Sequence, residues 1–342
     1  MKRRCQTMAL LILVTTQCGL SQEGFNIFPF IIPADARSFA MGESFAALPS
    51  NPSGLLYNPA GLAGLSGIRA SYSQRSLASE SKPILRSFNV VTGTPIGVFA
   101  AQYNRDSYGD LPITVYGSGP APMSTYDYDI GVGYAVALGR GFSIGGAVKY
   151  YSSHGLSVYP TIGYPMSSVS TSPFIYDFGL MYTFQRFHPQ DVIEDSITIG
   201  FSYQNIGSGT TTGLLPFDMA EYDIHEFPQY FRAGLSYALR VVPRGDGDVS
   251  PFQAVFCGEY RSDQSTAADD AAGFGMEFTI DEIVSLRAGG LFLSSDRGAH
   301  IRYGAGVRLP FRPLGLGLAL QGAVIPWYSV YAFSIDVRSD LP

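Results

Sequence analysis

Hydrophobic and polar residues alternate along most of the chain after residue 67. In residues 301–309, IRYGAGVRL, every second residue is apolar or aromatic, and Arg302 and Arg308 fall on the opposite face. Residues 130–138 and 231–240 repeat this pattern. A period of two is typical of a β-strand whose two faces meet different surroundings. The pattern therefore predicts strands and no long helices in this part of the chain.

About fourteen segments show the alternation. We predict strands near residues 68–76, 87–91, 97–104, 127–137, 142–153, 173–185, 195–205, 230–240, 252–261, 273–278, 285–293, 300–309, 315–324 and 330–337. An even number of antiparallel strands is typical of a bacterial outer-membrane barrel, with short periplasmic turns and longer extracellular loops. In the first half of the chain the odd-numbered connections are the longer ones. This places the N-terminus and the short turns in the periplasm.

Composition favours a barrel over a soluble β-sandwich, which also has alternating strands. The chain is 46% hydrophobic and 15% charged, yet after residue 21 no apolar run is long enough for a membrane helix. It contains 22 Tyr and 23 Phe residues, many of them near predicted strand ends, where the aromatic girdles of a membrane barrel would lie.

The first 21 residues have the features of a signal peptide. Lys2, Arg3 and Arg4 precede the apolar residues 8–14, and small residues follow near position 20. Cys18 raises a lipid anchor as a weaker alternative. Removing three positive charges changes the formal net charge from −6 to −9, which makes nucleic acid an improbable partner. Because the other cysteines lie in this segment, Cys257 alone remains, and no internal disulfide can form.

Glycine is frequent on the inferred inward face of the strands. The positions are Gly131, Gly133, Gly145, Gly234, Gly304, Gly306, Gly315 and Gly317. A glycine within a strand commonly marks the close approach of another segment. We therefore expect part of the chain to occupy the lumen, and residues 22–66 are the long stretch left over.

Residues 34–65 predict a compact plug. Residues 36–48 contain helix formers, Asp35 is a candidate N-cap, and Pro49 would end the helix. Two Asn-Pro pairs, at 51–52 and 58–59, then predict turns. We expect an all-β protein: a transmembrane antiparallel β-barrel of about 14 strands, residues 67–338, with a small N-terminal helical hatch, residues 22–66.

This N-terminal stretch resembles the PorV/PorQ-like family of outer-membrane proteins, within the FadL-type superfamily. The family pattern AR..AMG..F.AL, followed by NP.GL.YNPAGLA, corresponds here to residues 36–48 and 51–63. Residues 103–110, 204–207, 227–237 and 286–290 also fit. The resemblance implies a fourteen-stranded barrel with a hatch that carries an Asn-Pro-Ala motif. That motif, with the glycine after it, is Asn58, Pro59, Ala60 and Gly61.

The sequence offers little support for enzymatic chemistry, and we expect no catalytic residues, cofactor or metal. The four histidines are scattered without metal-ligand spacing, at His154, His188, His225 and His300. Ser153 and His154 are neighbours in a predicted strand, so their side chains would point to opposite faces.

Two groups of residues are candidates for a binding role. Apolar hatch residues would line a ligand pocket at the junction of hatch and barrel, namely Phe39, Phe45, Leu55 and Leu56. Inward-facing cations form the second group: Lys149, Arg232, Arg240, Arg287, Arg302 and Arg308. These cations either bind anionic head groups or a partner's carboxylate, or pair with acids such as Asp35 and Glu43 or with loop acids. We favour pairing.

Two functions follow from the resemblance. PorV and PorQ imply a role in type IX-like protein secretion, in which the loops at 105–126, 154–172 and 206–229 bind secreted cargo or secretion subunits. The alternative is a FadL-like transporter that passes small hydrophobic or amphipathic molecules across the outer membrane. A structural barrel without transport is a weaker third. Outer-membrane lipid surrounds the barrel in every case.

Overall fold

The computed structural model describes most of the chain from residue 35 onward. The described residues are 35–49, 52–77, 84–114, 120–156, 168–169, 174–187, 193–207, 228–241, 250–264, 269–295, 299–311, 316–325 and 330–339. The predicted signal peptide and the start of the predicted hatch lie outside them. No helix in the described ranges is long and apolar enough to cross a membrane.

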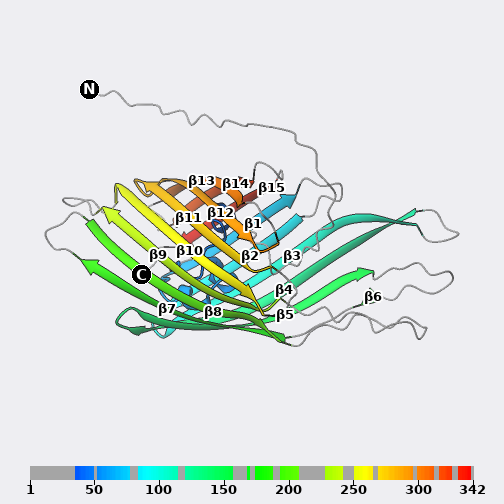
Figure 1. The fold of residues 1–342 in the computed structure, drawn as a ribbon, viewed down its shortest axis with the longest axis horizontal. Helices are drawn as coiled ribbons and strands as arrows, with labels where there is room; N and C mark the ends of the chain where they lie inside the picture. The colour runs from blue at the N-terminus through cyan, green and yellow to red at the C-terminus, as the bar shows by residue number, and fades with distance from the viewer. Residues whose placement is uncertain are drawn as a thin grey trace, which may run out of the picture.

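One antiparallel sheet closes on itself to form a barrel of fourteen strands (Figure 1). The barrel strands are β1 Ile68–Leu77, β2 Ile84–Thr94, β3 Gly97–Thr114, β4 Pro120–Gly139, β5 Phe142–Leu156, β7 Phe174–Phe187, β8 Ile193–Ile206, β9 Tyr230–Val241, β10 Phe252–Asp263, β11 Ala271–Ile280, β12 Val284–Leu293, β13 Ala299–Phe311, β14 Leu316–Ile325 and β15 Val330–Ser339. β15 pairs with β1 and closes the barrel, while β6, Ser168–Val169, pairs with the end of β5. The predicted fold class is confirmed, and all fourteen predicted strands are present.

The outer face of the barrel is apolar and aromatic. In β7, alternate side chains at Phe174, Phe178 and Leu180 are about half exposed, whereas Ile175 and Asp177 between them are fully buried. The other strands repeat this alternation. A wall that shows apolar side chains outward and buries polar ones inward is that of a transmembrane barrel, because the outer face meets lipid and the inner face does not.

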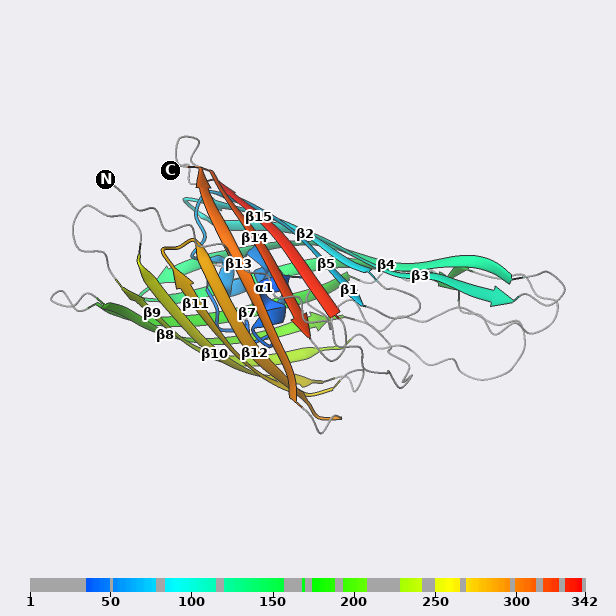
Figure 2. The ribbon, with the colours of Figure 1, turned by 90° about the horizontal axis from the view of Figure 1, so that it is seen from above.

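The hairpin of β3 and β4 is longer than predicted. Residues 105–126 were expected to form a loop, but their backbone continues the ladder, with Thr114 opposite Pro120 and a register shift between Ser107 and Asp110. The hairpin extends beyond the rest of the barrel (Figures 1 and 2). The apolar alternation ends near Asn104, yet backbone pairing does not need an apolar face outside lipid, so the strands continue.

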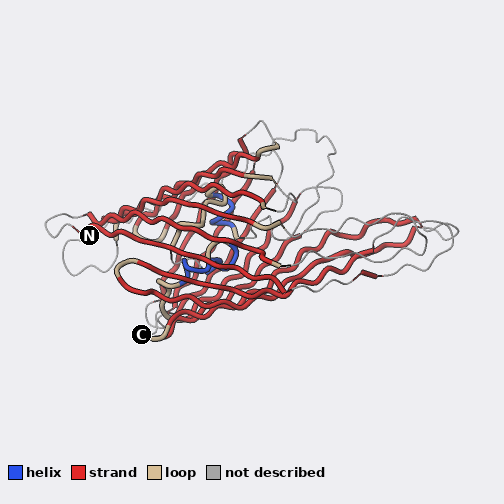
Figure 3. Tube along the Cα trace, turned by 60° about the horizontal axis from the view of Figure 1, so that its bottom comes forward, coloured by secondary structure: helices blue, strands red, loops and turns tan. Residues whose placement is uncertain are grey.

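The N-terminal residues 35–49 and 52–66, called here the lumenal segment, lie inside the barrel (Figures 2 and 3). They form α1 Ala36–Ala40 and the 3-10 turns η1 Pro52–Leu56 and η2 Pro59–Leu62. Asp35 caps α1 as expected, since its carboxylate accepts hydrogen bonds from the backbone N–H groups of Arg37 and Ser38. The predicted helix over 36–48 is too long, because Gly42 and Glu43 adopt positive φ angles of 62° and 61° and end it.

The inward glycines give the lumenal segment its space. A Cβ added at Gly200 would lie 1.9 Å from the carbonyl oxygen of Ala46, and one at Gly145 would lie 2.5 Å from the Pro59 carbonyl carbon. Gly133, Gly234 and Gly304 likewise face residues of the segment. Gly131 and Gly306 face the wall side chains Gln102 and Arg287 instead. The glycines thus mark where the wall backbone meets this segment.

We expect the substitution Gly200→Ala to weaken docking of the lumenal segment by roughly 1–3 kcal/mol, the usual cost of overpacking. Gly258→Ala is the matched control, because its new Cβ would have its nearest described atom 3.8 Å away. The temperature at which the barrel loses its folded migration on a gel, and the rate at which protease cuts residues 35–66, measure the effect. Equal behaviour of the two variants would contradict close packing at Gly200.

Candidate functional site

The side chain of Asn58 joins the lumenal segment to itself and to the wall. Its Nδ2 donates to the carbonyl oxygens of Ala46 (2.6 Å) and Leu180 (3.1 Å), and its Oδ1 accepts from the N–H of Ala60 (3.0 Å). A Cβ on Gly179 would lie 2.0 Å from that Oδ1. Asn58 is buried, so a residue with both a donor and an acceptor is needed at this position.

Wall side chains supply hydrogen bonds to the backbone of the lumenal segment. Three serine hydroxyls donate to its carbonyl oxygens and two wall groups accept from its N–H groups. The pairs are Ser202 to Tyr57 (2.6 Å), Ser236 to Ala47 (2.8 Å), Ser143 to Ala60 (3.2 Å), Ala36 to Ser334 (2.8 Å) and Ala46 to Glu259 (2.7 Å). Buried backbone groups need such partners, so these bonds allow an irregular segment to fill the lumen.

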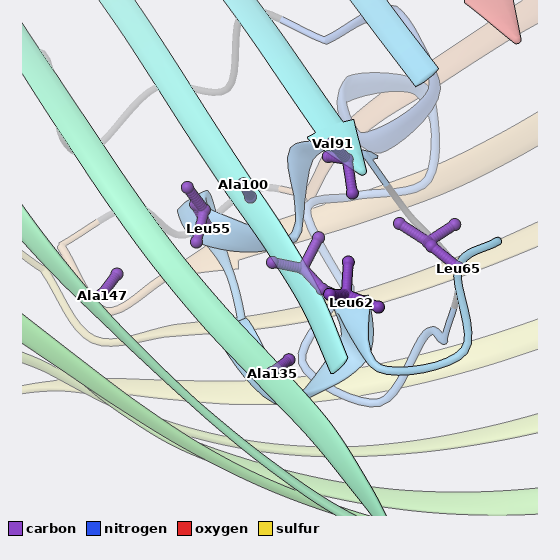
Figure 4. Packing of buried hydrophobic residues seen from close by; sticks show 8 residues of the cluster. Leu55, Leu62, Leu65, Val91, Ala100, Ala135 and Ala147 are labelled. Carbon is purple, nitrogen blue, oxygen red and sulfur yellow. The ribbon is translucent and has the colours of Figure 1, made fainter. Parts of the chain in front are cut away.

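Apolar contacts complete the docking, as Figure 4 shows for one cluster. Leu55, Leu62 and Leu65 of the segment pack there against small and branched wall residues. These are Val91, Val98, Ala100, Ala135 and Ala147. Contacts of this kind are non-directional, whereas the hydrogen bonds fix position, so the two together hold the segment in one orientation.

The four residues predicted to line a ligand pocket are packed in three separate clusters. Phe45 and Leu56 share a cluster with Met41 and Tyr57. Phe39 packs with Ala36, Ala40, Ala323 and Ala332, and Leu55 belongs to the cluster of Figure 4. Phe39, Phe45 and Leu55 are almost fully buried. These side chains thus contribute to the packing of the docked segment at three places, and a ligand pocket formed by them stays a prediction from sequence.

Glu43 connects the lumenal segment electrostatically to two wall arginines. Its carboxylate accepts hydrogen bonds from Arg302 (2.6 Å) and Arg261 (3.2 Å), and all three side chains are buried. Burial by itself would raise the pKa of the Glu43 carboxyl, but Arg302 and then Arg261 outweigh it and lower that pKa from 4.5 to about 2. Glu43 is therefore ionised over the whole physiological range.

The other predicted cations divide into paired and open groups. Lys149 pairs with Asp177 (2.5 Å), Arg232 with Glu259 (2.6 Å) and Arg287 with Glu277, all of them buried in the wall. Arg240 is about half exposed and contacts Glu282 at 3.3 Å. Arg308 is half-buried, and among the described residues no carboxylate lies within ion-pair distance of it.

Pairing was expected with acids of the hatch or the loops, yet most of the partners are acids of the neighbouring strands. Arg302 alone of the six predicted cations contacts Glu43, and Asp35 caps α1. Sequence reasoning missed Arg261, which stands opposite Arg232 in the ladder and pairs with Glu43. The alternation of β10 could have predicted this position, since Arg261 falls on the same inward face of the strand as Cys257 and Glu259.

A polar cavity of about 290 Å³ lies on one side of the lumenal segment. Its lining comes from the segment and from the ends of β1 and β10–β15 that face the short turns. The charged residues that line it are Asp35, Arg37, Arg69, Glu277, Arg287, Arg308, Asp336 and Arg338. In the ranges described, no group of three or more His, Cys, Asp or Glu side chains could hold a metal ion. His188, His225 and most of the loops predicted at 154–172 and 206–229 lie outside these ranges.

Comparison with solved structures identifies the fold. The chain resembles the CymD monoaromatic hydrocarbon channel with a TM-score of 0.50 and 12% identity, covering 92% of this chain and 99% of that one. The Pseudomonas putida toluene transporter TodX gives a TM-score of 0.45 at 12% identity, covering 90% of this chain and 98% of that one. A Pseudomonas aeruginosa FadL homologue gives a TM-score of 0.44 at 11% identity, covering 90% of this chain and 99% of that one. No family model and no curated protein matches the sequence. The fold is that of the CymD channel, whereas the FadL-type superfamily and its PorV/PorQ branch stay predictions from sequence.

Replacing Asn58 with Asp tests its donor role, because Asp keeps the acceptor for Ala60 and loses both donations. The carboxylate would also face the carbonyl oxygens of Ala46 and Leu180. We expect docking to weaken by about 2–4 kcal/mol, the range for an unpaired buried polar or charged group. Ion conductance across a planar bilayer would then rise above that of the unaltered barrel. Unchanged conductance and protease resistance would show that this amide does not hold the segment.

Acidification should weaken the contact of Glu43 in a defined window. Lowering the pKa of Glu43 from 4.5 to about 2 corresponds to about 3 kcal/mol of stability. Because the folded-state pKa is the lower one, this contribution is complete above about pH 4.5 and is lost as the pH falls to about 2. The difference in unfolding free energy between the unaltered protein and Glu43→Gln should shrink across that window. A difference independent of pH would mean that Glu43 does not carry this charge.

Proposed function

We propose that this protein is an outer-membrane channel for small amphipathic molecules, obstructed by a hatch that comprises residues 22–66. The observation that carries the proposal is the docked lumenal segment: a closed barrel contains an irregular stretch of its own chain, fixed by hydrogen bonds and ion pairs to the wall. Hydrogen bonds between neutral groups can be exchanged for bonds to water at small net cost, which supports a segment that can be displaced and docked again.

The lining of the lumen selects the class of molecule. Wall residues that face inward are largely serine, asparagine, glutamine and ion-paired side chains. A purely apolar molecule gains little from such a surface, whereas the polar group of an amphipathic molecule can bind it. The CymD channel, whose fold this chain shares, is a monoaromatic hydrocarbon channel. Its fold supports passage of a small molecule, and the polar lumen here favours an amphipathic one.

The orientation belongs to the same proposal. The turns at one end of the barrel are tight, as between β2 and β3 and between β11 and β12, whereas the β3–β4 hairpin projects from the other end (Figure 1). Short turns face the periplasm in barrels of this kind. The hatch, whose start precedes β1, would then enter the lumen from the periplasmic side, and residues 67–338 would form the membrane barrel.

Type IX-like secretion is the other function predicted from sequence. It rests on the PorV/PorQ resemblance, and the solved structures that share this fold are described as channels and transporters. A native preparation from outer membranes distinguishes the two by mass spectrometry. A retained small amphiphile would support transport. A stoichiometric secreted protein held by its C-terminal domain, without a small ligand, would refute transport and support secretion.

Locking the hatch tests the channel directly. The Cβ of Ala47 lies 3.2 Å from the position of a Cβ on Gly234, close to the spacing of about 3.5–4.5 Å in a disulfide. In a Cys257→Ala background, we expect the double variant Ala47→Cys, Gly234→Cys to lose uptake of labelled octanoate into proteoliposomes when oxidised and to regain it on reduction. The two single-cysteine variants are the controls. Undiminished uptake through the oxidised double variant would refute a movable hatch.

A further inference from the structure

The cavity beside the lumenal segment contains more positive than negative charge. Five arginines and three carboxylates line it, together with neutral polar residues. The arginines are Arg37, Arg69, Arg287, Arg308 and Arg338, and the carboxylates are Asp35, Glu277 and Asp336. An excess of guanidinium groups around a partly enclosed space is electrostatically costly, and an anion inside that space would offset the cost.

Each of the three carboxylates accepts at least one hydrogen bond. Asp35 accepts from the backbone N–H groups of Arg37 and Ser38 at 3.1 and 3.2 Å. Glu277 accepts from Arg37 at 2.9 Å through both oxygens, and also from Arg287. Asp336 accepts from Gln321. Both oxygens of Glu277 are therefore engaged by arginines, whereas Asp35 and Asp336 accept from neutral donors and keep their charge.

Two of the arginines that line the cavity are candidate donors to a ligand, Arg287 and Arg308. The Nη1 of Arg287 has no hydrogen-bond partner among the described residues, although only 8% of that residue is exposed. Gly306 makes room for this guanidinium, because a Cβ there would lie 2.8 Å from Nη1. Arg308 is half-buried, and among the described residues no carboxylate lies within ion-pair distance of it.

We propose that this cavity binds the oxyanion group, carboxylate or phosphate, of a small molecule, with Arg308 and Arg287 as its donors. Guanidinium forks match both groups in geometry and charge. A volume of about 290 Å³ holds a head group or a small anion and no long chain. As the site that receives the polar end of a passing amphiphile, it rests on the proposed function. As an anion site, it can be tested without transport.

Calorimetry on the full chain in neutral detergent, at constant ionic strength, tests the site with three probes: hexanoate, inorganic phosphate and the uncharged hexanol. We expect saturable binding of at least one anion and none of comparable strength for hexanol. Arg308→Gln should weaken anion binding roughly tenfold or more, the usual effect of losing a charged hydrogen bond. Arg240→Gln is the matched control, because Arg240 is also a cation near the short turns but does not line the cavity.

The outcomes separate the sources of the anion. Tighter binding of hexanoate than of phosphate assigns the site to amphiphilic carboxylates, and the reverse assigns it to phosphate or phosphorylated molecules. Absence of anion binding, or an equal loss in both arginine variants, overturns the proposal, provided that gel migration shows each variant folded. Anion binding by a barrel that fails the octanoate assay would refute the channel and leave the site intact. Transport without anion binding would refute the anion site and leave the channel intact.

Discussion

The structure depends on one constraint: the backbone of the lumenal segment is irregular, and its N–H and C=O groups must find partners inside the barrel. A regular helix or sheet would satisfy them internally. Here α1 is five residues long, and the rest consists of two short 3-10 turns and irregular backbone, so the wall has to provide the missing bonds. Serine hydroxyls, the Asn58 amide and the Glu259 carboxylate do so at fixed places. Glycines bring the wall backbone close enough for these short side chains to reach.

Charge adds a second level of specificity to this arrangement. Glu43 follows the left-handed turn that ends α1, and that turn places its carboxylate between Arg261 and Arg302. A buried carboxylate without these partners would be expensive, and so would the two guanidinium groups without it. The positive φ of Gly42 and Glu43 therefore determines both where the helix ends and which charges meet. The cavity near the short turns adds a further group of charges, lined by five arginines and three carboxylates.

Much of this architecture could be predicted from sequence because a period of two is a local signal. Alternation at residues 301–309 placed Arg302 inside and Tyr303 outside, and the structure agrees. Inward glycines likewise predicted that another segment fills the lumen. The partners of Lys149, Arg232 and Arg287 could not be predicted, because ladder register determines which acid on a neighbouring strand stands opposite each cation. The dispersal of Phe39, Phe45 and Leu55 among separate clusters depends on the turns between them, which hydrophobicity does not encode.

The contacts of α1 with the last strands of the barrel have a consequence for the order of assembly. The N–H of Ala36 donates to the hydroxyl of Ser334, 298 residues further along the chain, and α1 also contacts β13 and β14. Contacts of such sequence separation form only after the intervening chain has been arranged. The segment that leaves the ribosome early is thus among the last to reach its final place. Until β15 pairs with β1, its binding surface is incomplete, so closure of the sheet and docking of its contents are coupled steps of one folding reaction.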